Sequence, residues 1–272
     1  MIDSWDPRQY DRFQREREQP FFDLLALVRP VPRMKVVDLG CGTGKLTRIL
    51  HERLQAVETI GIDRSDRMLA ATRAEALPAG LSFEVGTIES FIARSAGLAA
   101  STAVCDLIFS NAALHWVVDH DALLSRLAGA LPPEGQLAFQ VPAQHDTLSH
   151  VVAEEITAIE PFRSAFRGWH RPQPVLAPEE YARLLYRCGF DDPIVRLIVY
   201  PHVLAGPDEV VEWMKGTLLT EYARHLPADL FDRFVEEYGT RLVARLDATR
   251  PFFFPFKRIL CWGLRSGCLP RG

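Results

Sequence analysis

Apolar positions in the first half of the chain follow two alternating patterns. Short runs of Val, Ile, Leu and Phe predict buried strands at 35–40, 58–63, 81–85, 104–110 and 136–141. Between them, apolar residues recur every three or four positions and predict helices at 44–54, 66–77 and 120–131. Alternating strands and helices predict an α/β fold with a doubly wound, mostly parallel sheet, in which ligands bind beyond the carboxyl ends of the strands.

The second half continues this pattern and then departs from it. A helix ending at Gly189 and a strand at 193–200 are expected first. Helical spacing follows over 208–248, where Pro227 separates two helices, and 251–265 predicts a last strand or hairpin. We therefore expect seven strands and the following segments: an N-terminal helical cap (1–30), a ligand-binding core (31–142), a basic lid (143–178), a core helix and strand (179–205), a helical insertion (206–250), a final strand (251–265) and a loose tail (266–272).

Composition narrows the class of protein. A chain of 272 residues, 48% hydrophobic and 24% charged, fits one large domain or a domain with a sizeable insertion. No apolar run approaches the roughly 20 residues of a membrane span, and the charged start is unlike a signal peptide, so a cytoplasmic protein that avoids membranes is expected. A net charge of -4 gives no general attraction to nucleic acid. The five scattered cysteines predict structural thiols and no metal site.

The stretch "VVDLGCGTGKLT", residues 36–47, is the first candidate for a binding site. Its glycines are spaced G-x-G-x-G, and Lys45 stands where a dinucleotide fingerprint has its third glycine. A P-loop fails because residue 39 is Leu and Leu46 follows the lysine. Asp38 would repel a pyrophosphate but attract ammonium and sulfonium groups, and Asp63 is placed to accept from ribose hydroxyls. S-adenosylmethionine is such a ligand, although Asp38 could also cap a turn and Asp63 could instead be a helix N-terminal carboxylate.

These motifs resemble those of the class I S-adenosylmethionine-dependent methyltransferases. "VVDLGCGTG" is similar to their first motif and "GIDRSDRML" to their second, whereas Thr87 stands where an Asp often binds adenine. A nicotinamide oxidoreductase or a noncatalytic binding protein is the more distant alternative. The cofactor-binding residues that the resemblance implies are Asp38, Gly40, Cys41, Gly42, Asp63, Arg64, Met68, Thr87, Ile88, Asn111 and Ala112.

A narrower resemblance covers nearly the whole chain. "WDPRQYDRFQREREQP", "NAALHWVVDH", "VVEWMKGT" and "FPFKR" are similar to segments of the trans-aconitate 2-methyltransferases, and "LHWVVDH" is also similar to the juvenile-hormone-acid methyltransferases. Both groups esterify carboxylates, so the resemblance implies a small-molecule carboxylate acceptor. His115 replaces a Gln of the trans-aconitate enzymes, Thr220 replaces an Arg, and "QVPAQ" replaces "QMPDN". These departures indicate an acceptor with fewer carboxylates.

A carboxylate acceptor also fits the polar residues of the chain. Its reference pKa of about 4 means that it is ionised at neutral pH, so the enzyme needs to position it and no general base. A methyltransferase acting on nitrogen, carbon or phenolic oxygen is the alternative, and a monomer or weak dimer is expected. His115 and Trp116 are expected over the methyl-transfer site, and the candidates for binding the acceptor are Tyr10, Arg17, His150, Arg171 and Arg258. The alternatives are core packing for Trp116, a satisfied histidine for His115, a helix salt bridge for Arg17 and a solvated loop around Arg171.

Overall fold

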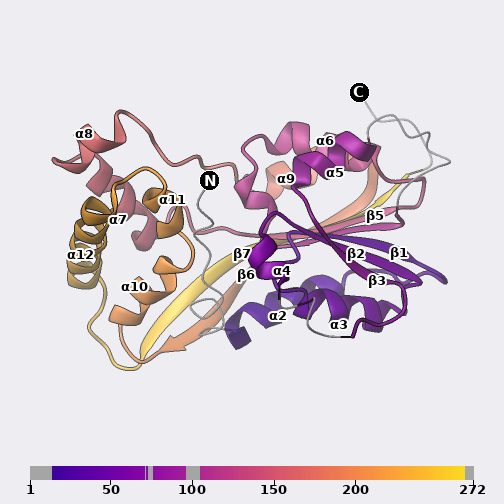
Figure 1. The fold of residues 1–272 in the computed structure, drawn as a ribbon, viewed down its shortest axis with the longest axis horizontal. Coiled ribbons are helices and arrows are strands. Elements are labelled where there is room, and N and C mark those ends of the chain that lie inside the picture. The colour runs from indigo at the N-terminus through magenta and orange to yellow at the C-terminus, as the bar shows by residue number, and fades with distance from the viewer. Residues whose placement is uncertain (1–13, 71, 73–75, 96–104, 267–272) are drawn as a thin grey trace. The chain divides into compact units, whose positions relative to one another are not determined.

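A computed structural model of the 272-residue chain describes residues 14–70, 72, 76–95 and 105–266 (Figure 1). The chain divides into two compact units, which are described separately. The sheet unit comprises Arg17–Pro142, Pro174–Ile198 and Arg258–Gly272. The helical unit comprises Met1–Glu16, Ala143–Gln173 and Val199–Lys257. The segment boundaries expected from the sequence stay predictions.

One seven-stranded sheet has the order β3-β2-β1-β4-β5-β7-β6. The pairs β1–β2, β2–β3, β1–β4 and β4–β5 are parallel, and β7 is antiparallel to β5. The expected doubly wound, mostly parallel sheet is therefore confirmed, and the strand order reverses between β1 and β4, where such sheets bind ligands. The strands are β1 Lys35–Leu39, β2 Glu58–Asp63, β3 Leu81–Val85, β4 Leu107–Asn111, β5 Gln136–Pro142, β6 Phe190–Leu204 and β7 Phe252–Arg265.

Helices cover both faces of the sheet unit. In Figure 1, α2 and α3 lie on one face and α5, α6 and α9 on the other. On the first face Phe21 of α2 and Leu50 of α3 pack with Val36 and Trp262 of the strands. The helices are α2 Gln14–Leu25, α3 Lys45–Leu54, α4 Asp66–Leu69, α5 Ile88–Ser95, η3 Leu114–Trp116 (a 3-10 turn), α6 His120–Gly129 and α9 Pro178–Arg187.

The helical unit has a separate aromatic core. Its helices are α7 Leu148–Thr157, α8 Phe162–Phe166, α10 Asp208–Lys215, α11 Leu219–Ala223 and α12 Ala228–Arg245. Buried Trp213, Tyr222, Phe234 and Tyr238 lie in one cluster, which accounts for the apolar spacing of 208–248. Pro227 separates two helices as expected, while a further break at Gly216 divides the stretch before it. Among the described residues, no helix is both long and apolar enough to cross a lipid bilayer.

Candidate functional site

The loop between β1 and α3 is built on three glycines with left-handed backbones. Gly40, Gly42 and Gly44 have φ values of 76°, 58° and 73°, a region that side chains rarely tolerate. A Cβ on Gly40 would lie 2.1 Å from Cβ of Ala113, so close packing is a second reason for a glycine at this position. A Cβ on Gly42 would meet only Cε of Met68, at 3.6 Å. The loop therefore leaves room for a ligand against the backbone of Gly42.

Asp63, the last residue of β2, holds this loop from the neighbouring strand. Its Oδ2 accepts a hydrogen bond from the Gly42 amide at 2.8 Å, and its Oδ1 accepts from the Ser65 amide at 2.9 Å. The side chain of Ser65, not of Asp63, is the N-cap of α4, where it accepts from the Met68 amide at 3.2 Å. Because a carboxylate oxygen can accept two hydrogen bonds, Asp63 retains acceptor capacity for hydroxyl groups of a ligand.

Asp38 is a second carboxylate at the same loop, and it is only 4% exposed. Its Oδ2 accepts from Oγ1 of Thr47 at 2.6 Å, whereas its buried Oδ1 has no hydrogen-bond partner in the described part of the chain. Burial, opposed by the Thr47 hydrogen bond and assisted by the charge of Asp63, raises the pKa of Asp38 to about 7. Two adjacent carboxylates, one with an unpaired oxygen, favour a cationic ligand.

Other predicted cofactor residues lie at the ends of neighbouring strands. Thr87 lies between β3 and α5, and Ile88 is the first residue of α5. Oγ1 of Thr87 accepts a hydrogen bond from the Ser90 amide at 3.1 Å. Cys41 is half-buried, and burial together with the nearby carboxylates raises its thiol pKa, so it stays protonated at neutral pH. Arg64 is exposed. The proton of the Thr87 hydroxyl can still be donated to a ligand.

A buried hydrogen-bonded row connects the end of β4 to β5 and β7. Asn111 accepts through Oδ1 from Nε2 of Gln140 at 2.7 Å, and Oε1 of Gln140 accepts from Nη1 of Arg258 at 3.1 Å. Gln140 is fully buried and Arg258 is 4% exposed. Ala112 has a φ of 56°, a strained value for a residue with a side chain, and its amide donates to the Gln140 carbonyl. The row fixes the orientation of Asn111, and Arg258 belongs to it.

His115 and Trp116 lie in the 3-10 turn η3, with ring centroids 4.6 Å apart. The turn is anchored by His120, whose Nε2 lies 3.1 Å from the Leu114 carbonyl and therefore donates to it. Nδ1 of His120 then accepts from the hydroxyl of Tyr181 at 2.6 Å. Burial lowers the pKa of His120, which favours this neutral state. The sheet unit thus holds the turn through a buried histidine and tyrosine.

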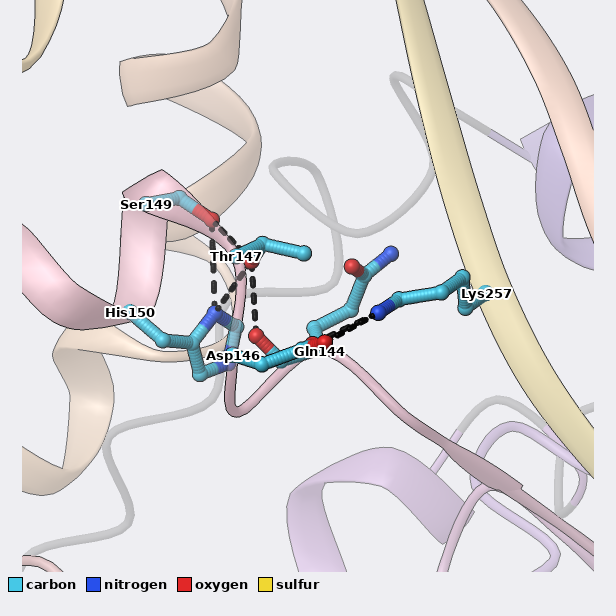
Figure 2. Close-up of polar contacts among 6 residues, drawn as sticks. All are labelled: Gln144, Asp146, Thr147, Ser149, His150 and Lys257. Carbon is cyan, nitrogen blue, oxygen red and sulfur yellow. Dashed lines mark hydrogen bonds and ion pairs between the residues drawn. The ribbon is translucent and has the colours of Figure 1, made fainter. Parts of the chain in front are cut away.

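Two candidates for binding the acceptor lie in the helical unit. Nδ1 of His150 lies 3.3 Å from the hydroxyls of both Thr147 and Ser149 (Figure 2). Burial and, secondly, the charge of Arg171 lower the pKa of His150 to about 3, so it is neutral at physiological pH. Nε of Arg171 is buried and has no hydrogen-bond partner among the described residues. Tyr10 lies outside the described residues.

Acidic neighbours partly offset the effect of burial on the Arg171 guanidinium. Burial lowers the pKa of its guanidinium, against the opposing influence of Tyr222, Glu221 and Glu154. Glu154 also accepts from Nδ1 of His170 at 2.8 Å and from the Tyr222 hydroxyl at 3.3 Å. His170 is therefore bonded to Glu154 within the helical unit, although its side chain is exposed, and Arg171 is partly buried beside the same carboxylate.

The predicted residues form two groups, one in each unit. The cofactor candidates, His115, Trp116 and Arg258 belong to the sheet unit, and His150 and Arg171 belong to the helical unit. Arg17 lies in α2, but its side chain is outside the described part of the structure. No group of three or more His, Cys, Asp or Glu among the described residues is arranged to hold a metal ion.

Sequence reasoning missed four polar residues that complete these groups. They are Thr47, Ser65, Gln140 and Gln144. Gln140 carried a signal, because it interrupts the apolar run of a buried strand. Thr47 and Ser65 carried none, since Ser and Thr are ordinary residues at a helix start.

The chain is similar in sequence to known methyltransferases. Residues 10–192 match a family described as "Methyltransferase domain". The chain is 39% identical to a trans-aconitate 2-methyltransferase of Deinococcus radiodurans, over 94% of this chain and 96% of that protein. It is 37% identical to a protein of the same name from Streptomyces avermitilis, over 95% of this chain and 96% of the other.

Solved structures share the fold at lower identity. The YcgJ protein of Bacillus subtilis has a TM-score of 0.60 and 15% identity, over 92% of this chain and all of the other. A phosphoethanolamine N-methyltransferase of Haemonchus contortus, in complex with S-adenosylhomocysteine, has a TM-score of 0.54 and 18% identity, over 91% of this chain and 52% of that one.

Proposed function

Because the chain belongs to the S-adenosylmethionine-dependent methyltransferase family, we propose that it transfers the methyl group of this cofactor to a carboxylate oxygen of a small organic acid. The observation that carries the proposal is the extent of the similarity. The relatives named trans-aconitate 2-methyltransferase match over 94% of the chain, well beyond the methyltransferase domain at 10–192, so the match includes most of the helical unit. The acceptor candidates His150 and Arg171 lie in that unit.

The residues of the glycine loop fit the cofactor. The open space beside Gly42 suits close approach of a ligand to the backbone, and the unpaired Oδ1 of Asp38 suits its ammonium group. Asp63 retains acceptor capacity for ribose hydroxyls, and Met68 lies beside Gly42 as an apolar wall. When bound, the cofactor supplies an electrophilic methyl group on a positively charged sulfur.

An acid acceptor requires no proton removal by the protein. Its carboxylate is already formed at neutral pH, so the chain's task is to orient one oxygen at roughly 3 Å from the methyl carbon and to exclude water. Arg171 is the proposed anion-binding residue of the helical unit, where its buried Nε can donate to a carboxylate. Neutral His150 contributes a hydrogen bond and no charge. Trp116 and His115 are proposed to wall the reacting groups.

The test is a screen of small mono-, di- and tricarboxylic acids with methyl-labelled S-adenosylmethionine. The proposal predicts label in an organic product and its release as methanol by mild base, because esters hydrolyse and methylated amines, carbons and phenols do not. A base-stable product would favour a nitrogen, carbon or phenolic oxygen acceptor instead. trans-Aconitate is the first acid to test, given the names of the relatives. Cytoplasmic location and the monomeric or weakly dimeric state stay predictions from the sequence.

A further inference from the structure

The side-chain amide of Gln144 is buried and forms no hydrogen bond with any residue that the structure describes. The residue is 2% exposed, and neither Nε2 nor Oε1 has a hydrogen-bond partner among the residues that the structure describes. Leaving such a group unpaired is costly, because it gives up its hydrogen bonds to water on folding and gains none in return. Buried polar groups in native proteins are nearly all paired, so an amide whose two polar atoms both lack a partner among the described residues calls for an explanation.

The backbone around Gln144 is firmly held. Its carbonyl accepts from the Thr147 hydroxyl at 2.6 Å and from the Thr147 amide at 2.9 Å, at the start of α7. The preceding amide, of Ala143, donates to the Lys257 carbonyl at 2.9 Å. In Figure 2 the side chain of Gln144 rises between Thr147 and Lys257, and no dashed line ends on its amide. The unpaired amide is thus presented from a fixed position.

Gln136 shows how the same protein treats a structural glutamine. It is 1% exposed, and its Oε1 accepts from the Arg29 amide at 2.9 Å and from Nε1 of Trp262 at 3.0 Å. Its Nε2 donates to the Arg29 carbonyl at 2.6 Å. A buried glutamine with a packing role is therefore fully bonded here, and Gln144 differs in kind.

The surroundings of Gln144 favour an anionic partner. The one carboxylate drawn beside it, Asp146, is neutralised by Nζ of Lys257 at 2.6 and 2.7 Å. His150, in the same cluster, feels the positive charge of Arg171, whose own buried Nε is also without a partner in the described structure. Unpaired donors near a positive charge suit a carboxylate.

We propose that Gln144 is a specificity-determining residue, whose amide NH₂ donates to a carboxylate of the acceptor that Arg171 helps to hold. The inference rests on the proposed function and adds to it that a second, non-reacting carboxylate is recognised. Di- and tricarboxylic acids are therefore the acceptor class, and monocarboxylic acids of similar size are poor acceptors.

The test replaces Gln144 with Met, which has nearly the same shape and no polar end. Gln144→Met is expected to raise KM for the best dicarboxylic or tricarboxylic acid about tenfold or more, to leave kcat and the Kd of S-adenosylhomocysteine within about twofold, and to keep or raise Tm. The matched control, Gln136→Met, breaks three hydrogen bonds and is expected to lower Tm with KM unchanged. Gln144→Glu, of equal size but negative, is expected to raise KM further.

The two readouts separate a binding role from a packing role. A lower Tm with an unchanged KM in Gln144→Met would show that the amide has a structural role and would overturn the inference. If the Met variant does not fold, an unchanged KM in Gln144→Glu would overturn it. Binding of the acids is also followed by thermal shift. If the wild-type protein binds an acid without esterifying it, the proposed function fails, while a thermal shift retained in Gln144→Met would overturn the role of Gln144. If it neither binds nor esterifies any acid, both proposals fail.

Discussion

Replacing Asp38 with Asn is expected to stabilise the fold while weakening cofactor binding. In the folded protein the pKa of Asp38 is raised from 3.8 to about 7, mainly by burial. The folded state therefore binds this proton more tightly than the unfolded state, and its stability falls as pH rises from about 4 to about 7. At a cost of about 1.4 kcal/mol per pKa unit, the charge of Asp38 costs about 4 kcal/mol above pH 7 and about 1.7 kcal/mol at pH 5.

The quantity to measure is the difference in the free energy of unfolding between Asp38→Asn and wild type, and how that difference changes with pH. Asn is uncharged at every pH, so the stability of Asp38→Asn relative to wild type is expected to rise by about 2.5 kcal/mol from pH 5 to pH 8. Urea unfolding at both pH values measures it, and any fixed cost of the unpaired Asn amide cancels. Asp232→Asn, on an exposed position of α12, is the control and is expected to show no such change.

Although Asp38→Asn is expected to be more stable than wild type, it is expected to bind the cofactor more weakly. Loss of the carboxylate removes a charge-assisted contact worth about 1.5–3 kcal/mol, a fall of about tenfold to a hundredfold in the affinity for S-adenosylhomocysteine by calorimetry at pH 8. If the stability of Asp38→Asn relative to wild type did not rise between pH 5 and pH 8, the raised pKa that we derive from the burial of Asp38 would be refuted. Unchanged affinity would refute its role as the partner of the cofactor's ammonium group.

Three further variants address the other parts of the site. Asp63→Ala is expected to fold and to bind S-adenosylhomocysteine about tenfold or more weakly in calorimetry, because ribose hydrogen bonds and the support of the loop are lost; unchanged affinity would remove it from the site. Gly42→Ala and Gly168→Ala both place a side chain at positive φ without a clash, so both are expected to lower Tm, but only Gly42→Ala to weaken cofactor binding. Arg171→Ala is expected to raise the acceptor KM about tenfold and to leave cofactor affinity unchanged, and equal KM values would assign Arg171 to the internal bonds of its own unit.

The sheet was predictable because its signals are local. Buried parallel strands are short apolar runs, and the glycines before α3 mark the ligand-binding turn, so the order of strands and helices follows from the pattern and from the handedness of crossovers. The strand expected at 193–200 is longer in the structure, as β6 Phe190–Leu204. Its length was hidden because charged residues and prolines at its ends weaken the apolar pattern.

The polar groups were less predictable because their roles depend on distant partners. The sequence around Gln144 does not reveal that its amide is buried and lacks a partner among the described residues. Nor does the sequence around Asp38 reveal that one of its carboxylate oxygens accepts a hydrogen bond from Thr47. His120 likewise pairs with Tyr181, sixty-one positions away. Burial and long-range hydrogen bonds arise only on folding, so the site residues named from motifs stay predictions until they are tested.

The central claim is that the acceptor is a carboxylate and that no residue removes a proton during methyl transfer. The most direct measurement is kcat with both substrates saturating, from about pH 6.5 to 9. A carboxylate titrates well below this range, so the account predicts a nearly flat profile, with at most a modest fall at the lower edge that His115→Gln removes while most activity remains. A rise of about tenfold per pH unit that His115→Gln abolishes would make His115 a general base and would contradict the account.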